Sequence, residues 1–128
     1  MAAAVEKTAT VLFIDDDAQH LKLYKWIIER GPFSVVPVLA GGGKFPDLPG
    51  GAPDVVALDY RLKGSFTAAE IAQELTLRYP QTPVLVLSEM EWLPDDVAPY
   101  SAAFLRKGQP EKLLEVLAEL SGGRSGNQ

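Results

Sequence analysis

Five residues with charged or reactive side chains stand where apolar runs of this sequence end. Asp15 and Asp16 follow VLFI, and Asp59 follows VVAL. Ser88 ends the run PVLVLS, and Lys107 ends AAFLRK. Carboxylates gathered without cysteine or histidine form a hard-oxygen site that suits Mg²⁺ or Mn²⁺. A lysine ammonium can neutralise a phosphoryl oxygen, and an aspartate can act as a nucleophile and become an aspartyl phosphate. The set therefore indicates phosphoryl transfer, in which positioning and charge neutralisation supply most of the catalysis.

The apolar runs and the amphipathic segments between them predict an α/β fold. Strands are expected over residues 10–14, 33–39, 54–58, 83–88 and 102–107. Helices are expected over residues 18–30, 68–78 and 111–120, where apolar residues recur at helical spacing. Strands that are apolar on both faces and alternate with helices predict a parallel sheet that is covered on both sides. We expect a doubly wound, five-stranded parallel sheet in the flavodoxin-like order 2-1-3-4-5.

This strand order explains two features of the sequence. It puts the second strand at a sheet edge, where Pro37, which has no N–H to donate, is tolerated. It also brings the carboxyl ends of the first and third strands together at the switch point where such sheets bind ligands. Asp15, Asp16 and Asp59 should therefore meet, while Asp17 is predicted to cap the first helix.

Two connections do not carry ordinary helices. The segment AGGGKFPDLPGGAPD, residues 40–54, is rich in glycine and proline, so the second helix of such a fold is predicted to be replaced by a loop. The segment EMEWLPDDVAPY, residues 89–100, can hold only a short or irregular helix. We expect a single domain over residues 1–121 and a flexible tail over residues 122–128.

Composition excludes several classes of function. The chain has 128 residues, a formal net charge of −5 and no cysteine. The negative charge argues against direct binding of nucleic acid, which needs a basic face. Without cysteine there can be neither a disulfide framework nor a thiolate metal site. No apolar run approaches the roughly 20 residues that span a bilayer, and no signal peptide is recognisable, so a cytoplasmic location without membrane insertion is expected.

The chain resembles the receiver domain of two-component response regulators over nearly its whole length. The matching pieces are VLFIDDD, VVALDYRLKG, PVLVLSEM and AAFLRKG, in this order. The resemblance implies that Asp59 accepts a phosphoryl group from a phosphohistidine of a sensor kinase. It implies Mg²⁺ (or Mn²⁺) held by Asp16 directly, by Asp15 largely through water, by Asp59, and by the backbone carbonyl of Arg61.

The resemblance also assigns the residues around the phosphoryl group. Ser88 would hydrogen-bond it, Lys107 would neutralise it, and Phe104 occupies the position of the switch aromatic. The reaction would be a self-catalysed transfer followed by autodephosphorylation rather than the turnover of a conventional enzyme. The implied partners are a sensor histidine kinase or a phosphotransfer protein, and a downstream effector protein. The sequence leaves open whether the chain forms a homodimer.

Departures from the family pattern keep two alternatives open. Glu89 stands where the family usually has a small residue, and Gly108 stands where it usually has a proline. These residues and the missing second helix motivate a receiver-like interaction module that signals without phosphorylation. A small phosphatase with an aspartate nucleophile is a remote alternative. His20, the only histidine, is predicted to be a plain surface residue without an acidic partner.

Overall fold

A five-stranded, all-parallel sheet in the order β2-β1-β3-β4-β5 forms the centre of the protein. The computed structural model describes residues 7–64 and 66–125. The strands are β1 (Ala9–Asp15), β2 (Phe33–Leu39), β3 (Val55–Asp59), β4 (Val84–Ser88) and β5 (Ala103–Arg106). The predicted fold class and strand order are confirmed. Each strand starts and ends within one residue of the predicted positions.

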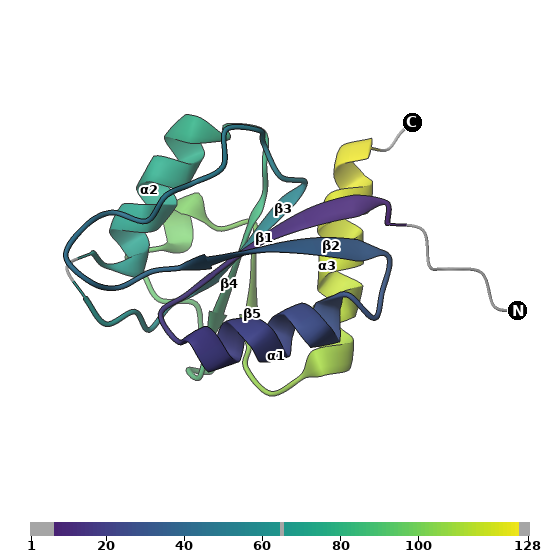
Figure 1. Ribbon diagram of the computed structural model, residues 1–128, viewed down its shortest axis with the longest axis horizontal. Helices are drawn as coiled ribbons and strands as arrows, with labels where there is room; N and C mark the ends of the chain where they lie inside the picture. The colour runs from purple at the N-terminus through teal and green to yellow at the C-terminus, as the bar shows by residue number, and fades with distance from the viewer. Residues whose placement is uncertain (1–6, 65, 126–128) are drawn as a thin grey trace, which may run out of the picture.

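Helices cover both faces of the sheet (Figure 1). They are α1 (Ala18–Ile28), α2 (Ala68–Arg78), α3 (Pro110–Ser125) and the short 3₁₀ helix η1 (Ala98–Tyr100). Helices α1 and α3 pack on one face, and α2 packs on the other together with the segments before and after it. Helix α3 continues beyond the predicted end at residue 120, so residues 122–125 of the expected tail are helical, while 126–128 lie outside the described residues.

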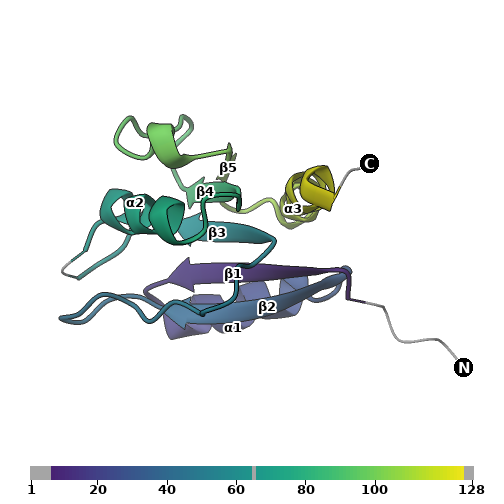
Figure 2. The same cartoon turned by 90° about the horizontal axis from the view of Figure 1, so that it is seen from above.

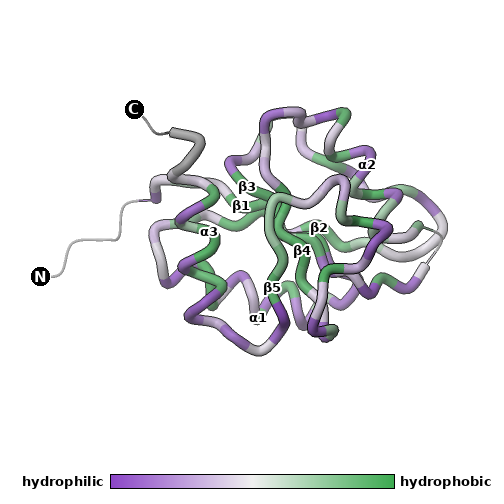
Figure 3. The backbone as a smooth tube through the Cα atoms, turned by 180° about the vertical axis from the view of Figure 1, so that it is seen from behind, coloured by the Kyte–Doolittle hydropathy of each residue, from purple (hydrophilic) through white to green (hydrophobic). Residues whose placement is uncertain are grey.

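Two apolar clusters, one on each face of the sheet, explain why strands and helices assemble in this way. Alternate residues of β1 point to opposite faces, so that Val11 and Phe13 join the cluster under α1 and α3, and Leu12 and Ile14 join the cluster under α2. All four side chains are at most 1% exposed. Figure 3 shows the resulting apolar strands inside a polar periphery. Burial on both faces is what the unbroken apolar runs of the sequence predict.

Strand β2 lies at the edge of the sheet, as Pro37 predicts. Pro37 is paired in register with Phe13 of β1, and its other side is exposed. A proline is tolerated there because an edge strand has a row of backbone groups without ladder partners.

The loop over residues 40–54 takes the place of a helix, as predicted, and it is packed rather than loose. Phe45 and Leu48 lie against the cluster under α2, and Phe45 contacts the ring of Phe66 edge to face at 5.1 Å. The hydroxyl of Tyr79 donates to the carbonyl of Pro49. These contacts fix the loop against α2 and so against the chain that follows β3.

All five strands point the same way, and Figure 2 shows the loops after β2, β3 and β4 at the end to which the arrows point. The residues at this end of the sheet form the site described below. None of the helices in the described ranges has the length and apolar character needed to cross a bilayer.

Candidate functional site

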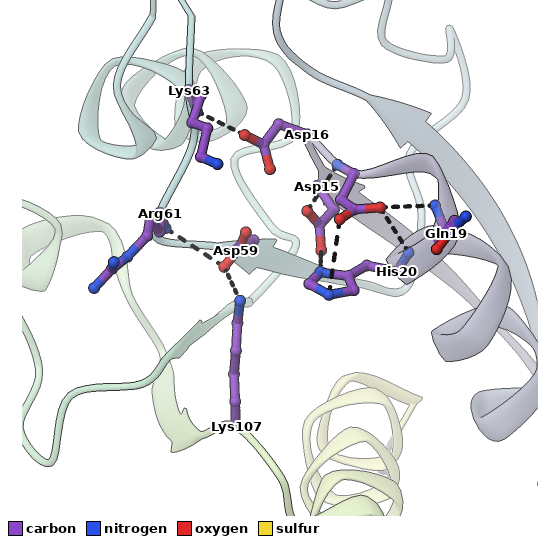
Figure 4. A network of polar contacts seen from close by, with 9 residues as sticks. Asp15, Asp16, Gln19, His20, Asp59, Arg61, Lys63 and Lys107 are labelled. Carbon is purple, nitrogen blue, oxygen red and sulfur yellow. Dashed lines mark hydrogen bonds and ion pairs between the residues drawn. The ribbon is translucent and has the colours of Figure 1, made fainter.

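Asp15, Asp16 and Asp59 form one acidic group at the carboxyl ends of β1 and β3 (Figure 4). The two strands are neighbours, with Ile14 paired to Leu58, so the residues that follow this pair meet in space. One carboxylate oxygen from each aspartate lies within 4.8 Å of the others. The structure therefore brings together the three acids that the sequence predicts.

Asp15 is the most buried of the three acids. It is fully buried, and its Oδ1 accepts a hydrogen bond of 3.1 Å from the backbone N–H of Asp17. Its buried Oδ2 accepts no hydrogen bond from the described residues. Burial, and after it the negative charge of Asp59, raise the pKa of Asp15 to about 7. A buried carboxylate oxygen beside two further carboxylates is an arrangement that a divalent cation stabilises.

Lys107 provides the positive charge of the site. Its Nζ lies 2.7 Å from Oδ1 of Asp59, and both side chains are largely buried. The backbone N–H of Lys107 donates to the carbonyl of Ser88 at 2.8 Å, which fixes the start of the lysine side chain just past β5. Burial alone lowers the pKa of Lys107, but the hydrogen bond to Asp59 and the charges of Asp59 and Asp15 outweigh it and raise the pKa. The lysine therefore stays charged beside Asp59.

Ser88 and Phe104 lie on the two strands beyond β3. Ser88 ends β4, is 4% exposed, and its Oγ accepts a hydrogen bond of 3.1 Å from the backbone N–H of Met90. Phe104 is half-buried on β5, opposite Val86 of β4, and packs against the cluster under α2. The hydroxyl thus lies at the same edge of the sheet as the acids, and the aromatic residue lies on the strand beside it.

The chain after β3 contacts two of the acids through its backbone. The N–H of Arg61 donates to Oδ1 of Asp59 at 3.4 Å, and the N–H of Lys63 donates to Oδ2 of Asp16 at 2.8 Å. The contact of Lys63 was not predicted, because it depends on how the turn folds back. Figure 4 shows it joining the loop after β3 to the loop after β1.

A close approach of two glycines holds this turn in place. A Cβ on Gly64 would lie 2.9 Å from Cα of Gly41, and Gly64 has a φ of +143°, which disfavours other residues. A Cβ on Gly41 would lie 3.2 Å from the carbonyl oxygen of Lys63. The glycine-rich loop after β2 therefore contributes to the site by letting its backbone approach the turn that holds Asp16.

His20 is exposed, as predicted, but the prediction that it has no acidic partner is wrong. Its Nδ1 lies 3.5 Å from Oδ2 of Asp15, and its Nε2 lies 3.9 Å from Oδ2 of Asp17. Asp17 caps α1 as predicted, accepting hydrogen bonds from the N–H groups of Gln19 and His20. His20 is thus the third residue of the helix, and side chains of the first turn point back toward the helix start. The position of His20 in the first helical turn, directly after three aspartates, was the signal in the sequence that could have predicted this contact.

Glu89 and Gly108, where the sequence departs from the receiver pattern, lie beside the site. Glu89 follows Ser88 and is exposed. Gly108 follows Lys107 and has a φ of +92°, a conformation that glycine adopts readily. Neither residue displaces the acids, the serine or the lysine from their common edge.

Comparisons with solved structures agree with this fold. No family model matches the sequence, and neither does any curated protein. Among solved structures, the receiver domain of the Francisella response regulator 1452 superposes with a TM-score of 0.71 at 17% identity, over 91% of this chain and 98% of that one. The chain has the fold of a response regulator receiver domain. A CheY-like receiver domain protein from Methanospirillum hungatei gives a TM-score of 0.71 at 16% identity, over 92% of this chain and 97% of that one.

A third structure with the same fold is that of a protein in complex with a metal ion. Response regulator TrrA from Thermotoga maritima, in complex with Mg²⁺ and BeF, has a TM-score of 0.71 and 16% identity, with 88% of this chain and 99% of that chain covered. In the present protein, three carboxylates, one of which has a buried oxygen without a hydrogen bond, make a donor set that fits a hard divalent cation. Any such ion would be held by Asp15, Asp16 and Asp59.

Proposed function

We propose that this protein is a phosphoacceptor receiver domain in which Asp59 takes a phosphoryl group from the phosphohistidine of a sensor histidine kinase or a phosphotransfer protein. The observation that carries the proposal is the placement of Asp59. Its carboxylate lies between a lysine ammonium at 2.7 Å and two further carboxylates within 4.8 Å. An aspartate with a lysine ammonium on one side and a divalent-ion site on the other can accept a dianionic phosphoryl group, because both cations neutralise its charge.

The proposed step forms one bond and breaks one bond. An oxygen of the Asp59 carboxylate attacks the phosphorus atom, the P–N bond of the donor breaks, and its electron pair stays on the imidazole nitrogen. Lys107, now paired with Asp59, would neutralise a phosphoryl oxygen, and the Ser88 hydroxyl would donate to another. A divalent ion on Asp15, Asp16, Asp59 and the carbonyl of Arg61 would neutralise the charge that develops. Water would later attack the acyl phosphate and release inorganic phosphate.

The proposed output is a change in a protein–protein surface. A phosphoryl group adds roughly −1.5 to −2 charges at neutral pH, as known for phosphorylated hydroxyl residues. The Ser88 hydroxyl, which now accepts from the N–H of Met90, would turn toward the phosphoryl group. Phe104, half-buried on the next strand, would then move inward, and a downstream effector would recognise the changed surface of β4, β5 and the segment between them.

The test is direct phosphorylation with a small donor. Untagged protein is incubated with acetyl phosphate and Mg²⁺, and intact mass spectrometry is expected to show one phosphoryl group that is stable in acid and lost in base. Asp59→Asn should abolish this adduct. Asp95→Asn, which changes an exposed aspartate, is the matched control and should be phosphorylated like the wild type.

Two other outcomes point to the alternatives. If neither the wild type nor Asp59→Asn acquires an adduct while both bind the same partner, the protein is a receiver-like module that signals without phosphate. Steady turnover of phosphate esters without a stable adduct would instead identify a small phosphatase with an aspartate nucleophile. Either result overturns the proposed phosphoacceptor role.

A further inference from the structure

We propose that His20 is a nitrogen ligand of the divalent-ion site. The histidine would raise the preference of the site for a transition ion such as Mn²⁺ or Co²⁺ over Mg²⁺, compared with a site made of carboxylates alone. This inference rests on the divalent-ion part of the proposed function and not on phosphorylation. Its basis is the contact between the imidazole of His20 and the carboxylate of Asp15, which Figure 4 shows.

The first observation is the unsatisfied oxygen of Asp15. Oδ2 of this fully buried side chain accepts no hydrogen bond from the described residues, and it belongs to the group of three acids. Buried carboxylate oxygens normally have a partner. This oxygen lacks a hydrogen bond but faces Nδ1 of His20, so a cation bound to it would lie beside the imidazole.

The second observation is the distance to the imidazole. Nδ1 of His20 lies 3.5 Å from Oδ2 of Asp15. Two donor atoms bound to one ion at about 2.1 Å each lie about 3.0 to 3.4 Å apart for bond angles between octahedral and tetrahedral values. The observed separation therefore lies within a few tenths of an ångström of that between two ligands of one ion. His20 does not belong to the group of acids whose ligand atoms all lie within 4.8 Å of one another, so its ring must also move toward Asp16 and Asp59, and the half-exposed side chain has room for this movement.

The third observation concerns the other ring nitrogen. Nε2 of His20 faces Oδ2 of Asp17 at 3.9 Å. A metal-bound histidine usually donates its second N–H to a carboxylate, which fixes the tautomer and the orientation of the ring. Asp17 is positioned for this role because its other oxygen caps α1 and so holds the side chain in place. The imidazole of His20 thus lies between the buried Oδ2 of Asp15, on the side of the acidic group, and the exposed carboxylate of Asp17 on its other side.

An aromatic stack supports the ring from the side. The ring of Tyr24 meets the imidazole of His20 edge to face, with the centroids 6.5 Å apart, and Tyr24 is itself stacked on the buried Phe13 at 4.8 Å. Tyr24 lies one helical turn beyond His20 on the same face of α1. The cap, the helix and the sheet together therefore keep the imidazole beside Asp15.

A nitrogen ligand changes which ion the site prefers. Mg²⁺ favours oxygen ligands and loses water reluctantly, whereas imidazole suits first-row transition ions. Removing His20 should therefore weaken Mn²⁺ binding and leave Mg²⁺ binding nearly unchanged. A histidine that acted only as a hydrogen-bond donor to Asp15 would affect both ions alike.

The test uses Mn²⁺ as a paramagnetic probe on the full, untagged chain. Electron spin echo envelope modulation of the bound ion should show the couplings of an imidazole nitrogen. Because the sequence contains a single histidine, selective labelling with ¹⁵N-histidine assigns such a signal to His20 alone. The signal should change in the labelled wild type and be absent from His20→Gln.

Affinities measured on the same proteins give the second readout. For His20→Gln we expect the Mn²⁺ affinity to fall by about 10-fold and the Mg²⁺ affinity by less than about 3-fold. Lys22→Gln, which changes an exposed residue of the same helix, should bind both ions like the wild type. Mn²⁺ binding without a histidine coupling, an equal loss for both ions in His20→Gln, or no Mn²⁺ binding at all would each overturn the inference.

Failure of this inference is distinct from failure of the proposed function. Phosphorylation of Asp59 with Mg²⁺, together with Mn²⁺ binding that lacks the histidine coupling, removes the role of His20 and keeps the receiver activity. A histidine coupling without any adduct on Asp59 supports the role of His20 and removes the phosphoacceptor function.

Discussion

The ammonium of Lys107 lies 2.7 Å from the carboxylate of Asp59, and this ion pair links the chain just past β5 to the end of β3 across the intervening strand β4. Both side chains are largely buried, at 16% and 3% exposed, so solvent screens the pair only weakly. The pair thus fixes the proposed nucleophile and supplies the charge that its phosphorylated form requires.

Replacing Lys107 with glutamine should reduce the rate of phosphorylation by acetyl phosphate by about 100-fold, because a preorganised donor at the developing charge is lost. The rate is followed by intact mass against time at saturating Mg²⁺. Lys112→Gln, which changes an exposed lysine of α3, should react at the wild-type rate. An unchanged rate in Lys107→Gln would show that Lys107 takes no part in the transfer.

Asp15→Asn should stabilise the metal-free protein, by about 1–3 kcal/mol, because it removes a charge that is fully buried beside Asp59. Urea unfolding at pH 8 in the presence of EDTA measures this difference. Mg²⁺ should stabilise the wild type but not the variant, since binding to the folded state alone raises the free energy of unfolding. Asp95→Asn is the control for loss of an exposed charge. A less stable Asp15→Asn would mean that Asp15 contributes favourable contacts without a metal.

Gly64→Ala should both destabilise the protein and weaken Mg²⁺ binding. Its Cβ would lie 2.9 Å from Cα of Gly41 at a φ of +143°, so the turn must shift, and the shift costs about 1–3 kcal/mol. The same turn carries the N–H of Lys63 that holds Asp16. Calorimetric titration with Mg²⁺ and urea unfolding provide the two readouts. Gly50→Ala, with no atom near its added Cβ, should change neither by much. If Gly64→Ala is destabilised but keeps the full affinity for Mg²⁺, the turn does not contribute to metal binding.

The sequence predicts the sheet and the residues at its edge because both follow from local rules. An unbroken apolar run of five to seven residues between turn signals is typical of a buried strand of a parallel sheet, so the runs that include Phe13 and Leu58 place the acids after them at one edge. The absence of a helix over residues 40–54 follows from glycine and proline in the same local way.

The contacts that the sequence does not predict depend on the path that the backbone takes in the folded protein. His20 contacts Asp15 only because the chain turns sharply at the helix cap. The number of residues between the two does not by itself predict this contact. Gly41 meets Gly64 across two loops whose path is set by packing of Phe45 against Phe66. Glycine content indicates flexibility or a turn, but it does not identify the backbone that comes close.

Glu89→Gln should accelerate phosphorylation by acetyl phosphate by roughly 3- to 10-fold, because an exposed negative charge next to Ser88 repels an anionic donor. The gain should shrink as the salt concentration rises, since salt screens exposed charges. Glu89→Ala separates charge from size: equal gains in both variants indicate charge, and a gain only in the alanine variant indicates steric hindrance. Glu115→Gln, on the exposed side of α3, is the control. A slower Glu89→Gln would show that the carboxylate assists the reaction.

Glu29 links the end of α1 to β2, and its contribution to stability should depend on pH. Its Oε2 accepts hydrogen bonds from Nζ of Lys25 at 2.7 Å and from the backbone N–H of Val35 at 2.9 Å. The hydrogen bond from Lys25, and then the one from Val35, lower the pKa of Glu29 below its ordinary value of 4.5. Folding therefore favours the ionised carboxylate.

Glu29→Gln should accordingly lower the free energy of unfolding by about 0.5–1 kcal/mol at pH 7, since the pair is partly exposed. Because the pKa is lowered in the folded state, this contribution is complete above pH 4.5 and is lost as the pH falls through the folded-state value. Urea unfolding of both proteins between pH 7 and about pH 3 should thus show a difference that vanishes on acidification. Glu119→Gln, an exposed glutamate of α3, should show no such trend. A difference that stays constant or grows toward acid pH would mean that Glu29 acts through packing and not through its charge.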